Sequence, residues 1–70
     1  MTQEEKIALL EETLEAEGLK AEMDLNDIAE YDSMAKLSLI VMMDDEFGKK
    51  LTGEQIREFK TVQDILDMMN

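Results

Sequence analysis

The chain has 70 residues, which is enough for one small domain with a core of few side chains. It contains no cysteine and no histidine, which excludes disulfides, thiolate metal sites and a histidine general base. The formal net charge of −11 disfavours nucleic acids and anionic membrane surfaces as partners, because their phosphate groups would be repelled.

The composition favours helices, since the chain has no proline and only three glycines. No apolar run approaches the roughly 18 residues of a membrane span. The N-terminal residues are acidic and lack the apolar segment of a secretory signal. We therefore expect a cytoplasmic monomer in which residues 1–70 form a single domain without a membrane span.

The first predicted helix runs from Thr2 to Glu17. Thr2 and Glu5 have the spacing of a capping box, in which the hydroxyl and the carboxylate satisfy free amides at the helix start. Gly18 suits the left-handed residue that ends a helix. An apolar stripe at helical spacing is expected to face the core, formed by Ile7, Leu9, Leu10 and Leu14.

Residues 19–31 are predicted to be a long connection with room for a short helical turn. Connections of this length are unusual in small domains and are often functional. The five acids between Glu22 and Asp32 do not match a calcium-binding loop, because alanine stands where that loop needs glycine. No metal site is predicted. Four apolar residues should hold the connection on the core: Leu19, Met23, Leu25 and Ile28.

The second helix is predicted from Ser33 to Phe47, with Asp32 as its N-cap and Gly48 at its end. Apolar residues occupy most of its circumference, which predicts a central, largely buried helix. Four of them are expected to form one buried face: Leu37, Ile40, Val41 and Phe47.

Two further helices are predicted near the C-terminus. A short one starts at Thr52, with Gln55 in the capping-box position, and another starts at Thr61. The fold class is therefore all-α: a small four-helix bundle with a long loop between the first two helices and a short third helix. The last helix should turn four side chains inward, namely Val62, Ile65, Leu66 and Met69.

Ser33 is the hydroxyl whose position needs an explanation, and three interpretations are open. It can simply help to start the helix, as serine often does. As a hydrolytic nucleophile it would need a base, usually histidine, and the chain has none; the nearest lysine is Lys36. As a site of covalent modification it would place a phosphate at a helix N-terminus, where free amides favour negative charge.

The segments "DSMAKLSLIVMMDDEFGKKL" and "TVQDIL" resemble the acyl carrier protein family. That family has Asp-Ser-Leu at the start of its second helix, Phe-Gly fourteen residues after the serine, and Thr-Val-x-Asp at the start of its last helix. Here these places are taken by 32–34, 47–48 and 61–64. The resemblance covers residues 25–69 and implies the carrier-protein bundle.

The resemblance implies that Ser33 is esterified with 4′-phosphopantetheine from coenzyme A by a magnesium-dependent phosphopantetheinyl transferase, which makes the chain a phosphoprotein. The thiol of the arm would carry an acyl group as a thioester, so the chain needs no catalytic residue and is not itself an enzyme. Asp32 would help the transferase recognise the site.

The resemblance also implies docking on basic patches of acyl-loading and acyl-using enzymes. Met34 would contact such partners near the modified serine. Asp44, Asp45 and Glu46 match acidic docking positions late in the second helix.

Several residues depart from the pattern of fatty acid biosynthesis carriers. Tyr31 and its neighbours replace a glycine before the motif, Lys36 and Ser38 make the early helix less negative, and lysines follow Gly48. These departures suggest a specialised pathway of lipid or secondary metabolism. Fatty acyl, aminoacyl, D-alanyl and polyketide-type cargoes all remain open. The alternative function is an acidic helical interaction module that keeps the fold without a prosthetic group.

Overall fold

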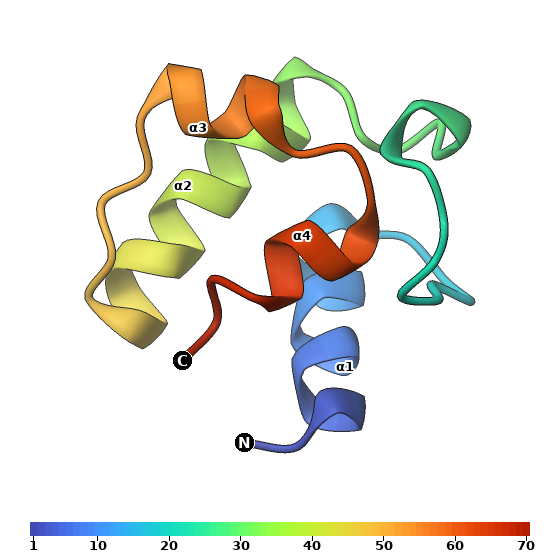
Figure 1. The fold of residues 1–70 in the computed structure, drawn as a ribbon, viewed down its shortest axis with the longest axis horizontal. Coiled ribbons are helices and arrows are strands. Elements are labelled where there is room, and N and C mark those ends of the chain that lie inside the picture. The colour runs from blue at the N-terminus through green and yellow to red at the C-terminus, as the bar shows by residue number, and fades with distance from the viewer.

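The computed structural model describes residues 1–70 and contains only helices as regular elements (Figure 1). No helix in it has both the length and the apolar character required to cross a membrane. The predicted all-α class, the long connection and the short third helix are confirmed. The elements in chain order are α1 (Gln3–Leu14), a 3-10 turn (Leu25–Asp27), α2 (Ser33–Phe47), α3 (Gly53–Glu58) and α4 (Val62–Leu66).

Capping boxes start three of the four helices, with Thr2, Thr52 and Thr61 as the N-caps. Each threonine hydroxyl accepts the backbone N–H three residues ahead, and the side chain there accepts the threonine N–H. At α4 the Asp64 carboxylate also accepts the N–H of Lys60 at 2.8 Å. Backbone hydrogen bonds from Lys60 and Thr61 lower the pKa of Asp64. The predicted helix starts are confirmed.

The prediction that the first helix reaches Glu17 is wrong, because α1 ends at Leu14. Glu15 adopts the left-handed conformation with φ 55°, and the N–H of Ala16 bonds to the carbonyl of Glu11 at 3.0 Å. This early end turns Ala16 into the core. Gly18 also has a positive φ of 70°, but it lies in the turn that follows rather than at the helix end.

The long connection is tied to the start of α4. The N–H of Leu25 donates to the carbonyl of Lys60 at 2.9 Å, and the N–H of Val62 donates to the carbonyl of Met23 at 3.0 Å. Figure 1 shows the connection leaving α1, forming the short turn and passing beside the chain that leads into α4. The predicted turn is confirmed, and the connection is held by backbone bonds as well as by apolar side chains.

The core contains 16 buried residues, all of them hydrophobic, in one cluster. α1 packs against both α2 and α4, and the connection contributes Leu19, Leu25 and Ile28. The four inward residues predicted for the last helix are all buried, but α4 ends at Leu66, so Met69 is buried from beyond the helix rather than from its inner face. The largest fully buried side chains are Leu10, Leu39, Met43, Val62, Ile65, Leu66 and Met69.

The prediction of a largely buried α2 is wrong for one of its faces. Leu37 and Val41 were expected in the core, but each is 59% exposed, and Met34 is 72% exposed. Ile40 and Phe47 are half-buried against the core. The face that packs inward is formed by Ala35, Leu39, Met42 and Met43.

Two leucines of α2 test this assignment of faces. Leu39→Ala should lower the free energy of unfolding by about 2–5 kcal/mol, because it leaves a cavity at a fully buried site. Leu37→Ala on the same helix should cost no more than about 0.5 kcal/mol, because its side chain is mainly in solvent. Urea unfolding followed by circular dichroism measures both. Equal losses would show that the two faces are assigned incorrectly.

Candidate functional site

Ser33 is the first residue of α2, and it is exposed. The preceding residue, Asp32, has extended backbone angles and acts as the N-cap. Its Oδ1 accepts the N–H of Ala35 at 2.9 Å. Because Asp32 performs the capping, the Ser33 hydroxyl is not required to start the helix. The predicted helix start and N-cap are confirmed.

The start of α2 is electrostatically suited to an anion. The first amides of a helix lack internal partners, and the aligned peptide dipoles place partial positive charge at this end. The Asp32 carboxylate takes the amide of Ala35, and the first turn of this 15-residue helix holds no further acid, so the amides of Ser33 and Met34 remain without a side-chain partner. An anionic group joined to Ser33 would therefore lie in a favourable field.

An exposed apolar stripe runs along α2 from this end; it consists of Met34, Leu37 and Val41 and is called the α2 stripe below. It lines a groove of about 560 Å³ between α2 and α1. Leu9 of α1 contributes to the opposite wall. Isolated exposed apolar residues are common on proteins, but three on one face of a helix are typical of a contact surface.

The three predicted docking acids lie at the other end of α2. Asp44, Asp45 and Glu46 are all exposed in its last turn, where negative charge is unfavourable to the helix dipole. Asp44 forms the only salt bridge of the molecule, to Lys50 at 3.5 Å, and both side chains are well exposed. Such a pair contributes little, so the acids remain available to a partner.

α2 therefore brings the predicted site residues onto one element. Ser33 and Met34 lie at its start, Asp44 to Glu46 lie at its end, and the α2 stripe joins them over roughly 17 Å of helix. The sequence reasoning missed Leu37 and Val41 as surface residues. Their spacing of three and seven residues from Met34 was the signal that could have revealed a second apolar face. The structure brings no three acids together in a metal-binding cluster.

Tyr31 and Lys36 form a contact beside the start of α2. The Lys36 Nζ lies 5.3 Å from the centroid of the Tyr31 ring, within the range of a cation–π interaction. The ring is half-buried, and its hydroxyl is buried without a hydrogen-bond partner. Burial raises the pKa of the Tyr31 hydroxyl, because the charged phenolate would lose its hydration.

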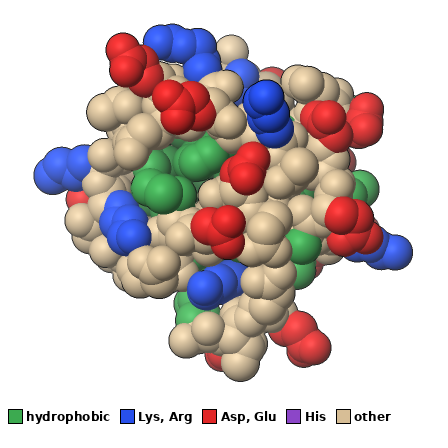
Figure 2. Space-filling view, in the orientation of Figure 1, with side chains coloured by type: hydrophobic (Ala, Val, Ile, Leu, Met, Phe, Trp, Pro, Cys, Tyr) green, Lys and Arg blue, Asp and Glu red, His purple; other side chains and the backbone are tan.

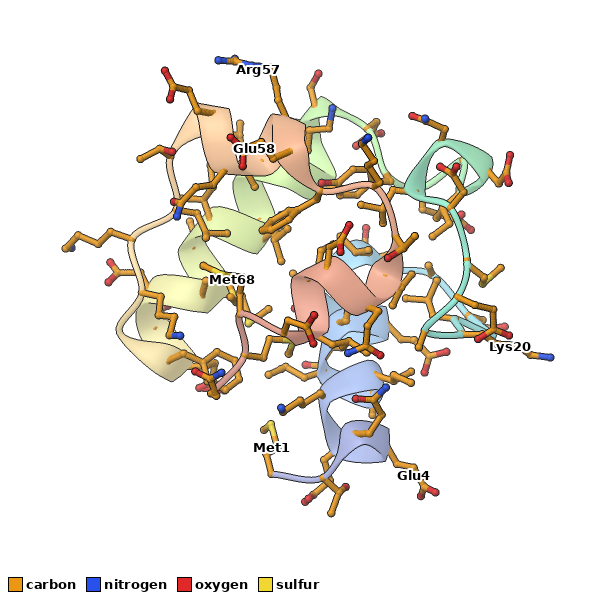
Figure 3. All side chains as sticks on the ribbon, viewed as in Figure 1. Met1, Glu4, Lys20, Arg57, Glu58 and Met68 are labelled. Carbon is orange, nitrogen blue, oxygen red and sulfur yellow. The ribbon has the colours of Figure 1, made fainter.

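A separate hollow of about 280 Å³ lies between α3 and α4. Its apolar lining comes from Phe59 and Met68, with Glu58, Asp64 and Asp67 around it. Figure 2 shows hydrophobic side chains exposed in a hollow with acids near it, and Figure 3 places Met68 after α4 and Glu58 on α3. None of the predicted site residues lines this hollow.

A family model described as "Phosphopantetheine attachment site" matches residues 7–69. The chain belongs to the acyl carrier protein family. The family resemblance found in the sequence is thus confirmed, and so is its cofactor: members bear a covalently attached 4′-phosphopantetheine and act as carriers for acyl-handling enzymes.

Relatives named "Acyl carrier protein" cover most of the chain. The protein of Micrococcus luteus is 33% identical over 61 residues, which are 86% of this chain and 75% of the relative. That of Myxococcus xanthus is 33% identical over 60 residues, or 84% and 76% of the two chains. That of Thermosynechococcus vestitus is 41% identical over 39 residues, or 56% and 48%. No solved structure matches the chain.

The residues at the start of α2 fit the family's prosthetic group. An exposed hydroxyl at a helix start accepts a phosphate ester without displacing any buried side chain. The amides at this end favour the added charge. The chain itself supplies no thiol, and the arm would supply the thioester chemistry.

Replacing Tyr31 tests the environment of its buried hydroxyl. Tyr31→Phe should raise the free energy of unfolding by about 1 kcal/mol, since it removes an unpaired buried hydroxyl and keeps the ring. Because burial raises the pKa of Tyr31 in the folded chain, folding favours the neutral phenol. Its contribution to the free energy of unfolding is complete below the unfolded pKa of about 10 and is lost as the pH rises through the higher pKa of the folded chain.

The difference in stability between wild type and Tyr31→Phe should therefore change above about pH 10, with the wild type losing more. Tyr31 is the only tyrosine, so phenolate absorbance reports its titration directly. A phenolate that titrates at the value of an unfolded peptide would contradict the buried environment.

Proposed function

We propose that this chain carries an acyl intermediate as a thioester on a 4′-phosphopantetheine arm attached to Ser33. Residues 1–70 act as one carrier domain around the single core, and the catalysis belongs to the partner enzymes. The arm comes from coenzyme A through a phosphopantetheinyl transferase. The Ser33 oxygen bonds to the phosphorus next to the pantetheine as the pyrophosphate linkage of coenzyme A breaks; the hydroxyl proton is lost and adenosine 3′,5′-bisphosphate leaves.

The observation that carries this proposal is that the helix cap and the exposed hydroxyl at the start of α2 belong to two different residues. Asp32 caps the helix with its Oδ1 on the N–H of Ala35, while Ser33 stands exposed as the first helical residue. An exposed serine with no structural task, in the motif position of a phosphopantetheine-bearing family, is best explained by modification. Asp32 has a second role in this proposal, as a recognition residue for the transferase.

The outer surface of α2 is the proposed docking surface. Its centre is the α2 stripe, which offers apolar contact area next to the arm. Asp44, Asp45 and Glu46 attract basic patches on acyl-loading and acyl-using enzymes and orient them. Lys36 near Ser33 makes the early part of this surface less negative, which favours partners from a specialised pathway rather than the main fatty-acid route.

Modification of Ser33 is tested by intact-protein mass. After incubation with coenzyme A, Mg²⁺ and a broad-specificity phosphopantetheinyl transferase, the chain should gain the mass of one phosphopantetheine. Ser33→Ala should gain nothing and keep its melting temperature. Ser38→Ala serves as the matched control, because Ser38 is an exposed serine of the same helix and its loss should leave the gain unchanged. A chain that several transferases leave unmodified would favour the interaction module.

Neutralising the acids at the end of α2 tests the docking surface. The triple variant Asp44→Asn, Asp45→Asn, Glu46→Gln should raise the transferase KM several-fold at low salt and leave kcat nearly unchanged. The difference should shrink at high ionic strength, since these exposed charges are screened. The control neutralises three exposed acids elsewhere: Glu17→Gln, Glu22→Gln and Glu58→Gln. An equal rise in KM in both variants would show that only net charge matters.

A further inference from the structure

Lys36 is a cation without a carboxylate partner in a strongly acidic chain. It is the only basic residue of α2, and like every basic residue except Lys50 it takes no part in the single salt bridge, although the chain has 18 acids. Its side chain is half-buried, and its Nζ lies over the ring of Tyr31. The ammonium thus contacts the Tyr31 ring and has no carboxylate within salt-bridge distance, so it keeps its capacity to bind an anion.

The position of the ammonium follows from helix geometry. Side chains on a helix lean toward its N-terminus, and residues three apart share a face. The 5.3 Å contact with Tyr31 shows that Lys36 reaches back beyond the first turn of α2, to the residue that precedes Asp32. Ser33 is three residues before Lys36, so the ammonium lies at the end of the helix where the arm is attached.

We propose that Lys36 binds the phosphodiester that joins the arm to Ser33. This inference rests on the proposed function. A phosphodiester carries a permanent negative charge, and the Lys36 ammonium and the free amides of α2 would hold it from two sides. Tyr31 keeps the ammonium near this position before modification. The contact restrains the base of the arm and leaves the thiol end free to reach partner active sites.

The test compares three chains before and after modification: wild type, Lys36→Met and Lys20→Met. Methionine keeps the apolar stem of the lysine and removes its charge. Lys20 is the matched control, since it lies on the connection after α1 and points away from the molecule (Figure 3). Intact mass first shows whether Ser33 of each chain carries the arm, and coenzyme A is then removed.

Two readouts are specific to the contact. The modified chain contains one phosphorus, so a single ³¹P resonance reports the phosphodiester. The chain has one tyrosine and no tryptophan, so its intrinsic fluorescence comes mainly from Tyr31 and responds to the Lys36 ammonium that lies over the ring. We expect the ³¹P resonance of wild type and Lys20→Met to coincide and that of Lys36→Met to be displaced. Modification should change Tyr31 emission in the first two chains, and Lys36→Met should lose most of that change.

The stabilisation by the arm gives an independent measure. Modification should raise the melting temperature of wild type and Lys20→Met by about 1–4 °C more than that of Lys36→Met, and high salt should remove the difference. Identical ³¹P resonances and equal shifts in all three modified chains would overturn the contact and leave the proposed function intact. If Ser33 is modified in none of the three chains, both the phosphodiester contact and the proposed function are overturned.

Discussion

The hydrogen bond from the N–H of Ala35 to Asp32 Oδ1 fixes where α2 begins, and the arrangement of the site depends on it. It makes Ser33 the first helical residue, next to the unpaired amides of the helix start. One face carries Ala35 and Leu39 into the core, and the opposite face carries Leu37 and Val41 into solvent. If α2 began later, Ser33 would lie in the connection, outside the helix that carries the α2 stripe and the acids.

The core contains no charged side chain. All 16 buried residues are hydrophobic, and one exposed salt bridge is the only ion pair in a chain with a net charge of −11. Apart from the carboxylates that cap helix starts, the acids therefore repel one another and contribute little to holding the helices together. Negative charge in the last turn of α2 even opposes the helix dipole. A partner with a basic surface would relieve this repulsion, which turns a cost in the free chain into a driving force for association.

Much of the fold could be predicted from local sequence, because the helix starts are specified by neighbouring residues. The threonine caps and Asp32 each bond to an amide three residues ahead, so their effect is visible without tertiary contacts. The end of α1 could not be predicted in this way. Glu15 adopts a left-handed conformation that few non-glycine residues take, and the burial of Ala16 accompanies it. That event depends on the rest of the core.

The two faces of α2 are a second feature that depends on tertiary packing and could not be predicted from local sequence. With apolar residues around most of the helix, periodicity cannot decide which face packs inward. The position of α1 decides it, and this placed Leu39 inside and Leu37 outside. The motif residues Asp32, Ser33 and Met34 were found because their pattern is local. Leu37 and Val41 were missed because their exposure is a property of the assembled bundle.

Backbone hydrogen bonds join the connection between α1 and α2 to the start of α4, so local unfolding of one segment breaks the bonds of the other. α4 has only five residues, too few to persist as an isolated helix. The amides of Leu25 and Val62 are held by carbonyls of the opposite segment, Lys60 and Met23. Because each segment supplies the other's hydrogen-bond partners, we expect the first half of the connection and the start of α4 to open together. Loosening α4 would thus free the part of the connection from which the chain continues toward Ser33.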